Sequence, residues 1–213
     1  MDGPISNCII FSQTVICAHP YLSVCMLIVY DLPRPCVGNG TARKTTLDVS
    51  FCHDLKAHDH SWPNINPDYT YTRISTEGAL ALIDKHFPGR SDMLETFVDI
   101  QNPGMKSDFL RYLVLLADGG VYTDTDTTAV RPINEWVPKQ YWDRARILVG
   151  IEWDIRDEEV QKWFVCPIQF AQLTNAATPY HPILENLVNS VLRSIQLHTA
   201  KYTTTVDKFD LSN

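Results

Sequence analysis

The run from residue 107 to residue 126 constrains this chain most, because it predicts a helix, a glycine turn and a strand that ends in two carboxylates. Ser107 is the expected N-cap of the helix. Gly119-Gly120 follows the apolar helical stretch and predicts a tight turn. The strand after this turn delivers Asp124-Thr125-Asp126 at its end. The run therefore predicts one unit of an α/β fold.

Asp108 and Arg111 lie three residues apart near the expected start of that helix, so they project from one of its faces. Asp108 is expected in the first turn, where the helix dipole favours a carboxylate. The pair offers an acceptor for a sugar hydroxyl and a rigid fork of donors. A salt bridge that only stabilises the helix or the domain is the alternative interpretation.

Asp124 and Asp126 are candidates for a shared polar site. In an extended segment, side chains two residues apart point to the same side, separated by roughly 7 Å. The two carboxylates repel each other, and a proton or a hard divalent ion such as Mn²⁺ or Mg²⁺ would relieve that repulsion. Such an ion also bridges to a diphosphate. The spacing therefore predicts a metal and diphosphate site, although Asp-x-Asp also occurs in solvated turns.

The rest of the chain predicts more helices and strands of a single α/β domain without internal repeats. Apolar residues at helical or alternating spacing mark most of these elements. The expected elements are a strand at 69–74, a helix at 76–86 with Ser75 as its N-cap, a strand at 147–151, a segment at 169–174 that is either helix or strand, and a helix from Pro182 to about Gln196.

The N-terminal stretch at 5–30 contains no Asp, Glu, Lys or Arg. It is nearly long enough to cross a bilayer, which takes about 20 apolar residues in a helix. His19-Pro20 interrupts it, and basic residues follow it without preceding it, which is the wrong charge balance for an ordinary signal-anchor. A membrane span and one or two buried strands both remain open.

The net charge of −7 and the pI of about 5.4 argue against nucleic acid as a partner. A protein that binds a phosphate backbone usually presents a basic surface. An acidic protein that binds an anionic nucleotide needs a cation, which agrees with a metal held by paired carboxylates.

Two blocks of sequence resemble glycosyltransferase family 32, and within it the fungal initiation-specific α-1,6-mannosyltransferases. The blocks are Lys106-Ser107-Asp108-Phe109-Leu110-Arg111-Tyr112 and Leu116-Ala117-Asp118-Gly119-Gly120-Val121-Tyr122-Thr123-Asp124-Thr125-Asp126. The resemblance extends over roughly residues 62 to 192.

The resemblance implies a GT-A fold, which is a single Rossmann-like α/β domain that binds a nucleotide sugar through a mixed central sheet flanked by helices. It implies retaining, metal-dependent transfer of a hexose, mannose from GDP-mannose, to a glycan acceptor in protein glycosylation. The expected metal is Mn²⁺ or Mg²⁺. The expected location is the Golgi membrane, with the catalytic domain in the lumen.

The same resemblance assigns roles to five residues. Asp124 and Asp126 would contact the donor ribose, the sugar and the metal. Asp108 and Arg111 would grip the transferred sugar. Tyr122 would line the donor site by packing beneath it. Two further candidates for acceptor or metal contacts are Glu152, which follows a predicted strand, and His181, which precedes a predicted helix.

The chain departs from the family pattern at both ends. Residues 1–60 form a divergent N-terminal region, 61–200 the expected catalytic core, and 201–213 a polar tail that lacks the family's Gly-Pro segment. These departures favour a shortened chain or an inactive, transferase-like binding domain as one alternative. A phosphatase of the haloacid dehalogenase type, with Asp124 as nucleophile and Asp126 as acid and base, is the other.

Overall fold

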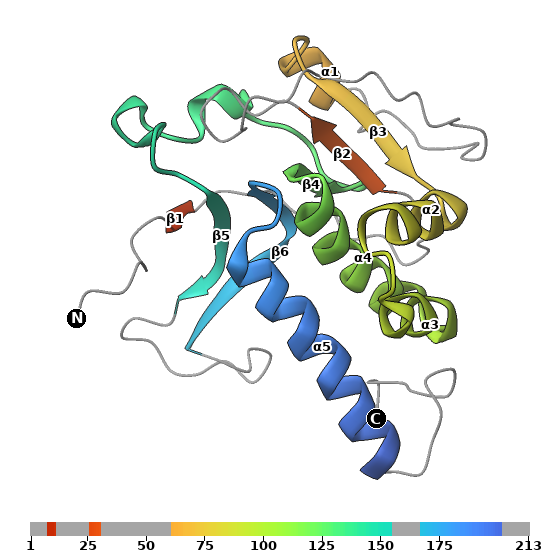
Figure 1. Cartoon of the computed structure of the whole chain (residues 1–213). Coiled ribbons are helices and arrows are strands. Elements are labelled where there is room, and N and C mark those ends of the chain that lie inside the picture. Colours follow the sequence, from red (N-terminus) through yellow and green to blue (C-terminus); the bar gives the residue numbers. More distant parts are fainter. Residues whose placement is uncertain (1–7, 12–25, 31–60, 155–166, 202–213) are drawn as a thin grey trace.

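The computed structural model describes residues 8–11, 26–30, 61–154 and 167–201, and its centre is a six-stranded sheet (Figure 1). The strand order is β1-β5-β6-β4-β2-β3. β1 and β5 are parallel, and every other neighbouring pair is antiparallel. The strands are β1 (Cys8–Phe11), β2 (Met26–Tyr30), β3 (Thr70–Ile74), β4 (Gly120–Asp124), β5 (Ile147–Asp154) and β6 (Ile168–Ala177).

The predicted mixed sheet is confirmed for these strands. Its pairing is nevertheless mostly antiparallel, whereas a Rossmann-like sheet is mostly parallel. The prediction of a membrane span or buried strands at 5–30 falls partly on described residues, and these form β1 and β2. No helix in the described ranges is both long and apolar enough to span a membrane. The predictions for 31–60 and for the tail after Lys201 concern residues outside the described ranges.

Two apolar clusters cover the two faces of the sheet. Neighbouring strand residues alternate between them: Tyr122 and Ala177 belong to the cluster under the long helices, whereas Val121 and Ala176 belong to the other. The first cluster packs against α2 (Thr76–His86), α3 (Ser91–Asp99), α4 (Pro103–Ala117) and α5 (Pro182–Lys201) (Figure 1). The second packs against α1 (Ser61–Ile65) and the connection between β4 and β5, which includes η2 (Ile133–Glu135) and η3 (Lys139–Tyr141).

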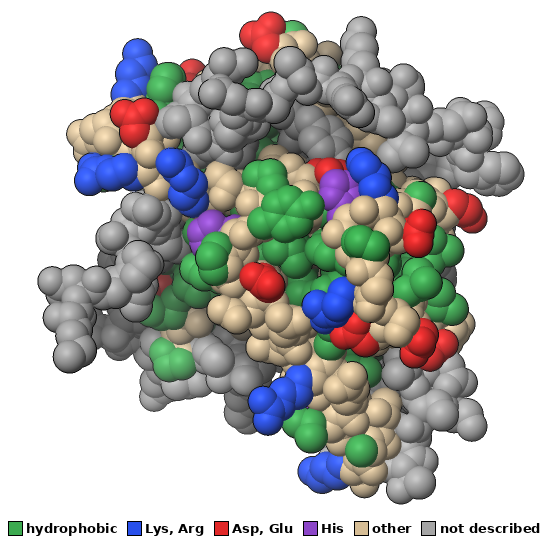
Figure 2. Space-filling view, viewed as in Figure 1, with side chains coloured by type: hydrophobic (Ala, Val, Ile, Leu, Met, Phe, Trp, Pro, Cys, Tyr) green, Lys and Arg blue, Asp and Glu red, His purple; other side chains and the backbone are tan. Residues whose placement is uncertain are grey.

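The outer surface of the helical layer mixes charges of both signs. Figure 2 shows acidic and basic side chains interspersed around apolar groups on this face. The described part of the face therefore presents no single-sign field.

The start of α4 corrects one prediction. The N-cap is Asn102, whose side chain accepts a hydrogen bond from the Met105 backbone N–H at 3.1 Å, and not Ser107. Pro103 at the first helical position suits this start, because the nitrogen there needs no partner within the helix. Asp108 consequently lies beyond the first turn, and the helix-dipole argument for it was wrong.

The turn between α4 and β4 has the predicted glycine geometry. Gly119 and Gly120 both have positive φ, +67° and +89°. A Cβ atom built on Gly119 would lie 2.6 Å from Pro179 Cδ and 2.8 Å from the carbonyl oxygen of Ala177. This turn reverses the chain tightly, so the first half of α4 lies beside the end of β4.

β6 contains a large bulge opposite β5. Val149 pairs with Asn175, and Ile151 pairs with Phe170, so two steps along β5 correspond to five along β6. The segment at 169–174, which the sequence left undecided, is therefore an irregular strand. Bulges re-aim side chains locally, and this one lies next to the site described below.

Candidate functional site

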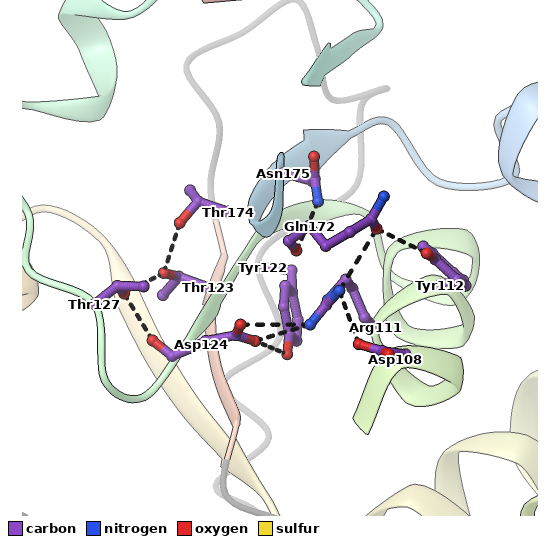
Figure 3. A network of polar contacts seen from close by, with 10 residues as sticks. All are labelled: Asp108, Arg111, Tyr112, Tyr122, Thr123, Asp124, Thr127, Gln172, Thr174 and Asn175. Carbon is purple, nitrogen blue, oxygen red and sulfur yellow. Dashed lines mark hydrogen bonds and ion pairs between the residues drawn. The ribbon is translucent and has the colours of Figure 1, made fainter. Parts of the chain in front are cut away.

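Side chains from α4, β4 and β6 meet at the C-terminal end of β4 (Figure 3). Arg111 Nη2 lies 3.1 Å from Asp124 Oδ1 and 3.4 Å from Oδ2. Arg111 Nη1 lies 3.0 Å from Asp108 Oδ1, so the two residues share one helix face, as their spacing predicted, and they form the salt bridge that was the alternative interpretation. One buried guanidinium thus bridges a helix carboxylate and the first carboxylate of Asp-x-Asp.

Tyr122 completes this contact from below. Its hydroxyl donates to Asp124 Oδ1, and its ring centroid lies 5.0 Å from Arg111 Cζ. The Tyr122 side chain is fully buried, and this burial raises its pKa, so the phenol stays protonated and acts as a donor. Although burial lowers the pKa of Arg111, the neighbouring phenol and carboxylates raise it above its usual value, so the guanidinium is a permanent positive charge.

The environment of Asp124 shifts the pKa of its carboxyl group in both directions. Burial raises the pKa of its carboxyl, the Arg111 charge and the Tyr122 hydrogen bond lower it, and the Asp126 charge raises it. The net direction is upward. Asp124 therefore holds its negative charge at a cost that a bound cation would relieve.

Asp126 does not follow the extended geometry that the sequence predicted. β4 ends at Asp124, and the backbone N–H and hydroxyl of Thr127 both donate to the Asp124 carbonyl oxygen, at 3.3 Å and 2.7 Å. These bonds close a turn that contains Asp126. Its half-buried side chain has no hydrogen-bond or ion-pair partner among the described residues. Of the two acidic side chains, Asp126 is thus the one left available to a ligand.

Neutral hydroxyl groups hold the same strand end on the opposite face of the sheet. Thr123 Oγ1 lies 2.9 Å from Thr174 Oγ1 and 2.6 Å from Thr127 Oγ1. Since the Thr127 hydroxyl donates to the Asp124 carbonyl oxygen, it accepts from the Thr123 hydroxyl, which in turn accepts from the Thr174 hydroxyl. Trp62 Nε1 adds a bond to Thr127 Oγ1 at 3.2 Å. Backbone and side chain of Asp124 are thus fixed from different faces.

Gln172 reaches the site from the β6 bulge. Its Oε1 accepts from the Tyr112 hydroxyl at 2.7 Å and from Arg111 Nη1 at 3.5 Å. Asn175 Nδ2 donates to the Gln172 carbonyl oxygen at 3.0 Å and stabilises the bulge (Figure 3). Sequence reasoning missed Gln172 and Asn175, and no local signal marks them, because the bulge depends on how β5 and β6 pair.

Two buried polar atoms of this network have no partner among the described residues: Arg111 Nε and Asn175 Oδ1. One is a donor and the other an acceptor, and buried polar atoms are rarely left unpaired. Both atoms are closed off from the surface, so they mark strain within the network and do not by themselves identify a ligand.

The fit to a metal is partial. The described residues contain no cluster of three or more His, Cys, Asp or Glu that could enclose an ion. Asp124 and Asp126 alone supply hard oxygen ligands, and Mg²⁺ and similar ions commonly take their remaining ligands from water and phosphate oxygens. The residues suit an ion that arrives with a diphosphate.

The two additional candidates have structural contacts. Glu152 Oε2 accepts from Gln169 Nε2 at 2.9 Å across the β5–β6 pair. His181 Nδ1 accepts from the Ile183 backbone N–H at 3.3 Å, where it caps the start of α5. Within the described ranges, no hydrogen bond or ion pair joins either residue to the Arg111 network.

Residues 53–143 match the family described as a glycosyltransferase sugar-binding region containing a DXD motif. The chain is 35% identical over 155 residues to an initiation-specific alpha-1,6-mannosyltransferase of Schizosaccharomyces pombe, covering 71% of this chain and 39% of that protein. It is 31% identical over 149 residues to the protein of the same name in Candida albicans, covering 68% and 39%.

A third relative has another kind of name. The chain is 28% identical over 92 residues to a mannosyl phosphorylinositol ceramide synthase of Saccharomyces cerevisiae, covering 43% of this chain and 23% of that protein. The chain thus spans about two fifths or less of the length of these curated relatives. No solved structure matches it significantly.

Proposed function

From the premise that residues 53–143 belong to the DXD-motif glycosyltransferase sugar-binding regions, we propose that this protein transfers a hexose from a nucleotide sugar to an acceptor. The observation that carries the proposal is the buried contact of Arg111 with Asp108 and Asp124 at the end of β4. It positions Asp124 at the end of β4, where strand ends of α/β folds commonly bind ligands, and Asp126 lies in the turn that follows.

Mannose is the hexose that the relatives support. The names of all three relatives contain a mannosyl group, although one name also contains an inositol ceramide and the other two do not. Mannose is therefore the part that the three names have in common. The proposed donor is GDP-mannose, and the proposed reaction retains the anomeric configuration. A mannose-bearing glycan is the proposed acceptor, and the Golgi membrane is the proposed location.

The proposed work of each residue follows from its surroundings. Asp126, which has no hydrogen-bond or ion-pair partner among the described residues, and the carboxylate of Asp124 would hold Mn²⁺ or Mg²⁺. Such an ion neutralises diphosphate charge and so stabilises a nucleotide leaving group. The Arg111 charge favours the ionised form of Asp124 and holds this side chain in place, and the exposed Asp108 would accept a hydrogen bond from a sugar hydroxyl.

The test is calorimetric binding of GDP-mannose and UDP-glucose, with and without Mn²⁺. For Asp126→Asn we expect Mn²⁺-dependent binding of GDP-mannose to weaken by about 10- to 100-fold, because a charged ligand contact worth about 1.5–3 kcal/mol is lost. Asp84→Asn is the matched control, since Asp84 is an exposed carboxylate on α2, and it should bind like the unmodified protein.

Two results would contradict the proposal. One is the absence of binding to either nucleotide sugar under every metal condition. The other is binding of GDP-mannose that neither Mn²⁺ nor Asp126→Asn changes. Preferred binding of UDP-glucose would leave a transferase standing and replace mannose with glucose.

A further inference from the structure

Gln172 lies on a face of the sheet that a regular strand would not give it. Thr174 contacts Thr123 on the α1 side, and side chains two residues apart in a regular strand share a side. Gln172 instead contacts Tyr112 and Arg111 of α4, on the opposite side. The β6 bulge, in which Asn175 Nδ2 binds the Gln172 carbonyl, causes this change of face.

The contacts of Gln172 also fix the orientation of its amide. Its Oε1 accepts from the Tyr112 hydroxyl at 2.7 Å and from the Arg111 guanidinium at 3.5 Å, so the oxygen points into the network. The Nε2 group carries two donors and has no partner within the described part of the chain. Because the Gln172 side chain is exposed, these donors are accessible to a ligand.

An acceptor lies on the other side of the same guanidinium nitrogen. Arg111 Nη1 contacts both Gln172 Oε1 and Asp108 Oδ1, the latter at 3.0 Å, and the Asp108 side chain is 58% exposed. An exposed carboxylate and an exposed amide donor therefore flank one buried nitrogen (Figure 3). Adjacent hydroxyls of a hexose match this pair, because one hydroxyl can donate while its neighbour accepts.

We propose that Gln172 is a sugar-binding residue that, together with Asp108, recognises two neighbouring hydroxyl groups of the donor hexose. The proposal rests on the function proposed above and adds a specificity residue to it. Gln172 lies outside the region at 53–143 that matches the family, so its role comes from the geometry of the bulge.

The variant Gln172→Glu tests the outward donors alone. A glutamate keeps an oxygen for Tyr112 and Arg111, so the internal contacts remain, but it has no amide hydrogens to donate at neutral pH. The probes are GDP and GDP-mannose, each titrated calorimetrically in Mn²⁺. The measured quantity is the ratio of the two Kd values, because a general effect of the added charge acts on both ligands.

We expect Gln172→Glu to weaken GDP-mannose binding by about 5- to 15-fold relative to GDP, as befits the loss of one or two hydrogen bonds. Gln172→Met, which removes the amide without adding charge, should change the ratio in the same direction. Gln196→Glu, at an exposed position on α5, is the charge-matched control and should leave the ratio unchanged.

The failures of the two proposals are distinguishable. If the two Gln172 variants weaken the binding of GDP and of GDP-mannose by the same factor, or weaken the binding of neither ligand, the proposed sugar contact is overturned. The proposed transferase function is not affected by that result. If the unmodified protein binds GDP but gains nothing from the mannose, the sugar contact is likewise overturned. If it binds no nucleotide sugar at all, the proposed function fails and this inference fails with it.

Discussion

Each end of the α4–β4 unit combines a basic side chain, an aspartate and a tyrosine, yet the two ends differ in burial. At the C-terminal end of β4 the tyrosine is fully buried, whereas near the α4–β4 turn the tyrosine is 60% exposed. The members are Arg111, Asp124 and Tyr122 at the first end and His86, Asp118 and Tyr180 at the second.

The difference shows that burial and the permanence of the charge matter more than composition. Arg111 stays charged at every accessible pH, and its own side chain is buried, although the Asp108 carboxylate that it contacts is exposed. His86 Nε2 lies 3.2 Å from Asp118 Oδ1 and Nδ1 lies 3.4 Å from the Tyr180 hydroxyl, but these groups are partly solvated. The first cluster can therefore keep the side chains of a ligand site in one fixed arrangement. The second cluster only makes weak contacts that join α2, α4 and the start of α5.

The largest expected effect comes from removing the buried charge. Arg111→Met leaves the half-buried carboxylate of Asp124 without its cation, and we expect the free energy of unfolding to fall by about 3–5 kcal/mol, as when one partner of a buried ion pair is lost. Urea unfolding followed by circular dichroism measures it. Arg193→Met removes an exposed arginine on α5 and should change stability by less than about 0.5 kcal/mol. Equal effects of both variants would erase the contrast.

The next effect concerns the turn at Gly119, beside the second cluster. The backbone conformation and close packing of this turn matter more than charge. Gly119→Ala combines a left-handed φ of +67° with a Cβ atom 2.6 Å from Pro179, so we expect a loss of about 2–4 kcal/mol. Gly89→Ala has a similar φ of +82° but nothing within 4 Å of its Cβ, and should lose only about 1–2 kcal/mol. If the two losses match in thermal unfolding, the contact with Pro179 contributes nothing.

The smallest expected effect is the pH response of His86. Burial lowers its pKa below the usual value, with Lys85 acting in the same direction and Asp118 against it. A lowered pKa in the folded state stabilises the fold above the usual histidine pKa, and this contribution is lost as the pH falls through the folded value.

As the pH falls from about 7.5 to about 5.5, the free energy of unfolding should therefore decrease less for His86→Gln than for the unmodified protein. We expect the two decreases to differ by under about 1 kcal/mol. The Arg111 cluster should show no comparable response in this range from its guanidinium. If the free energy of unfolding depends on pH in the same way for His86→Gln and for the unmodified protein, then the titration of His86 does not contribute to the stability of the second cluster.

Local signals made the best predictions of the fold. α2 has the predicted bounds, and the Ser75 side chain accepts from the Gly78 backbone N–H at 3.2 Å, because a capping residue and the apolar spacing lie within one short segment. The start of α4 was misplaced because Ser107 is also a good capping residue. Asn102-Pro103, farther upstream, is the pair that forms the cap.

The site was predictable where it depends on one element and hidden where it depends on several. The helical spacing of Asp108 and Arg111 predicted that they share one face, and the strand pattern put Asp124 at a strand end. The turn at Asp126 follows from hydrogen bonds to Thr127, and the position of Gln172 follows from the register between β5 and β6. Such tertiary pairing leaves no periodic pattern in either segment.

The place of β4 in the sheet bears on how the protein is made. Its two neighbours, β2 and β6, come from residues 26–30 and 168–177, on either side of it in the chain. During synthesis, β4 keeps one open edge until β6 has left the ribosome, and open strand edges promote aggregation. The strand that carries Asp124 is thus completed late, and a chaperone that shields it would act in the interval before Ala177 emerges.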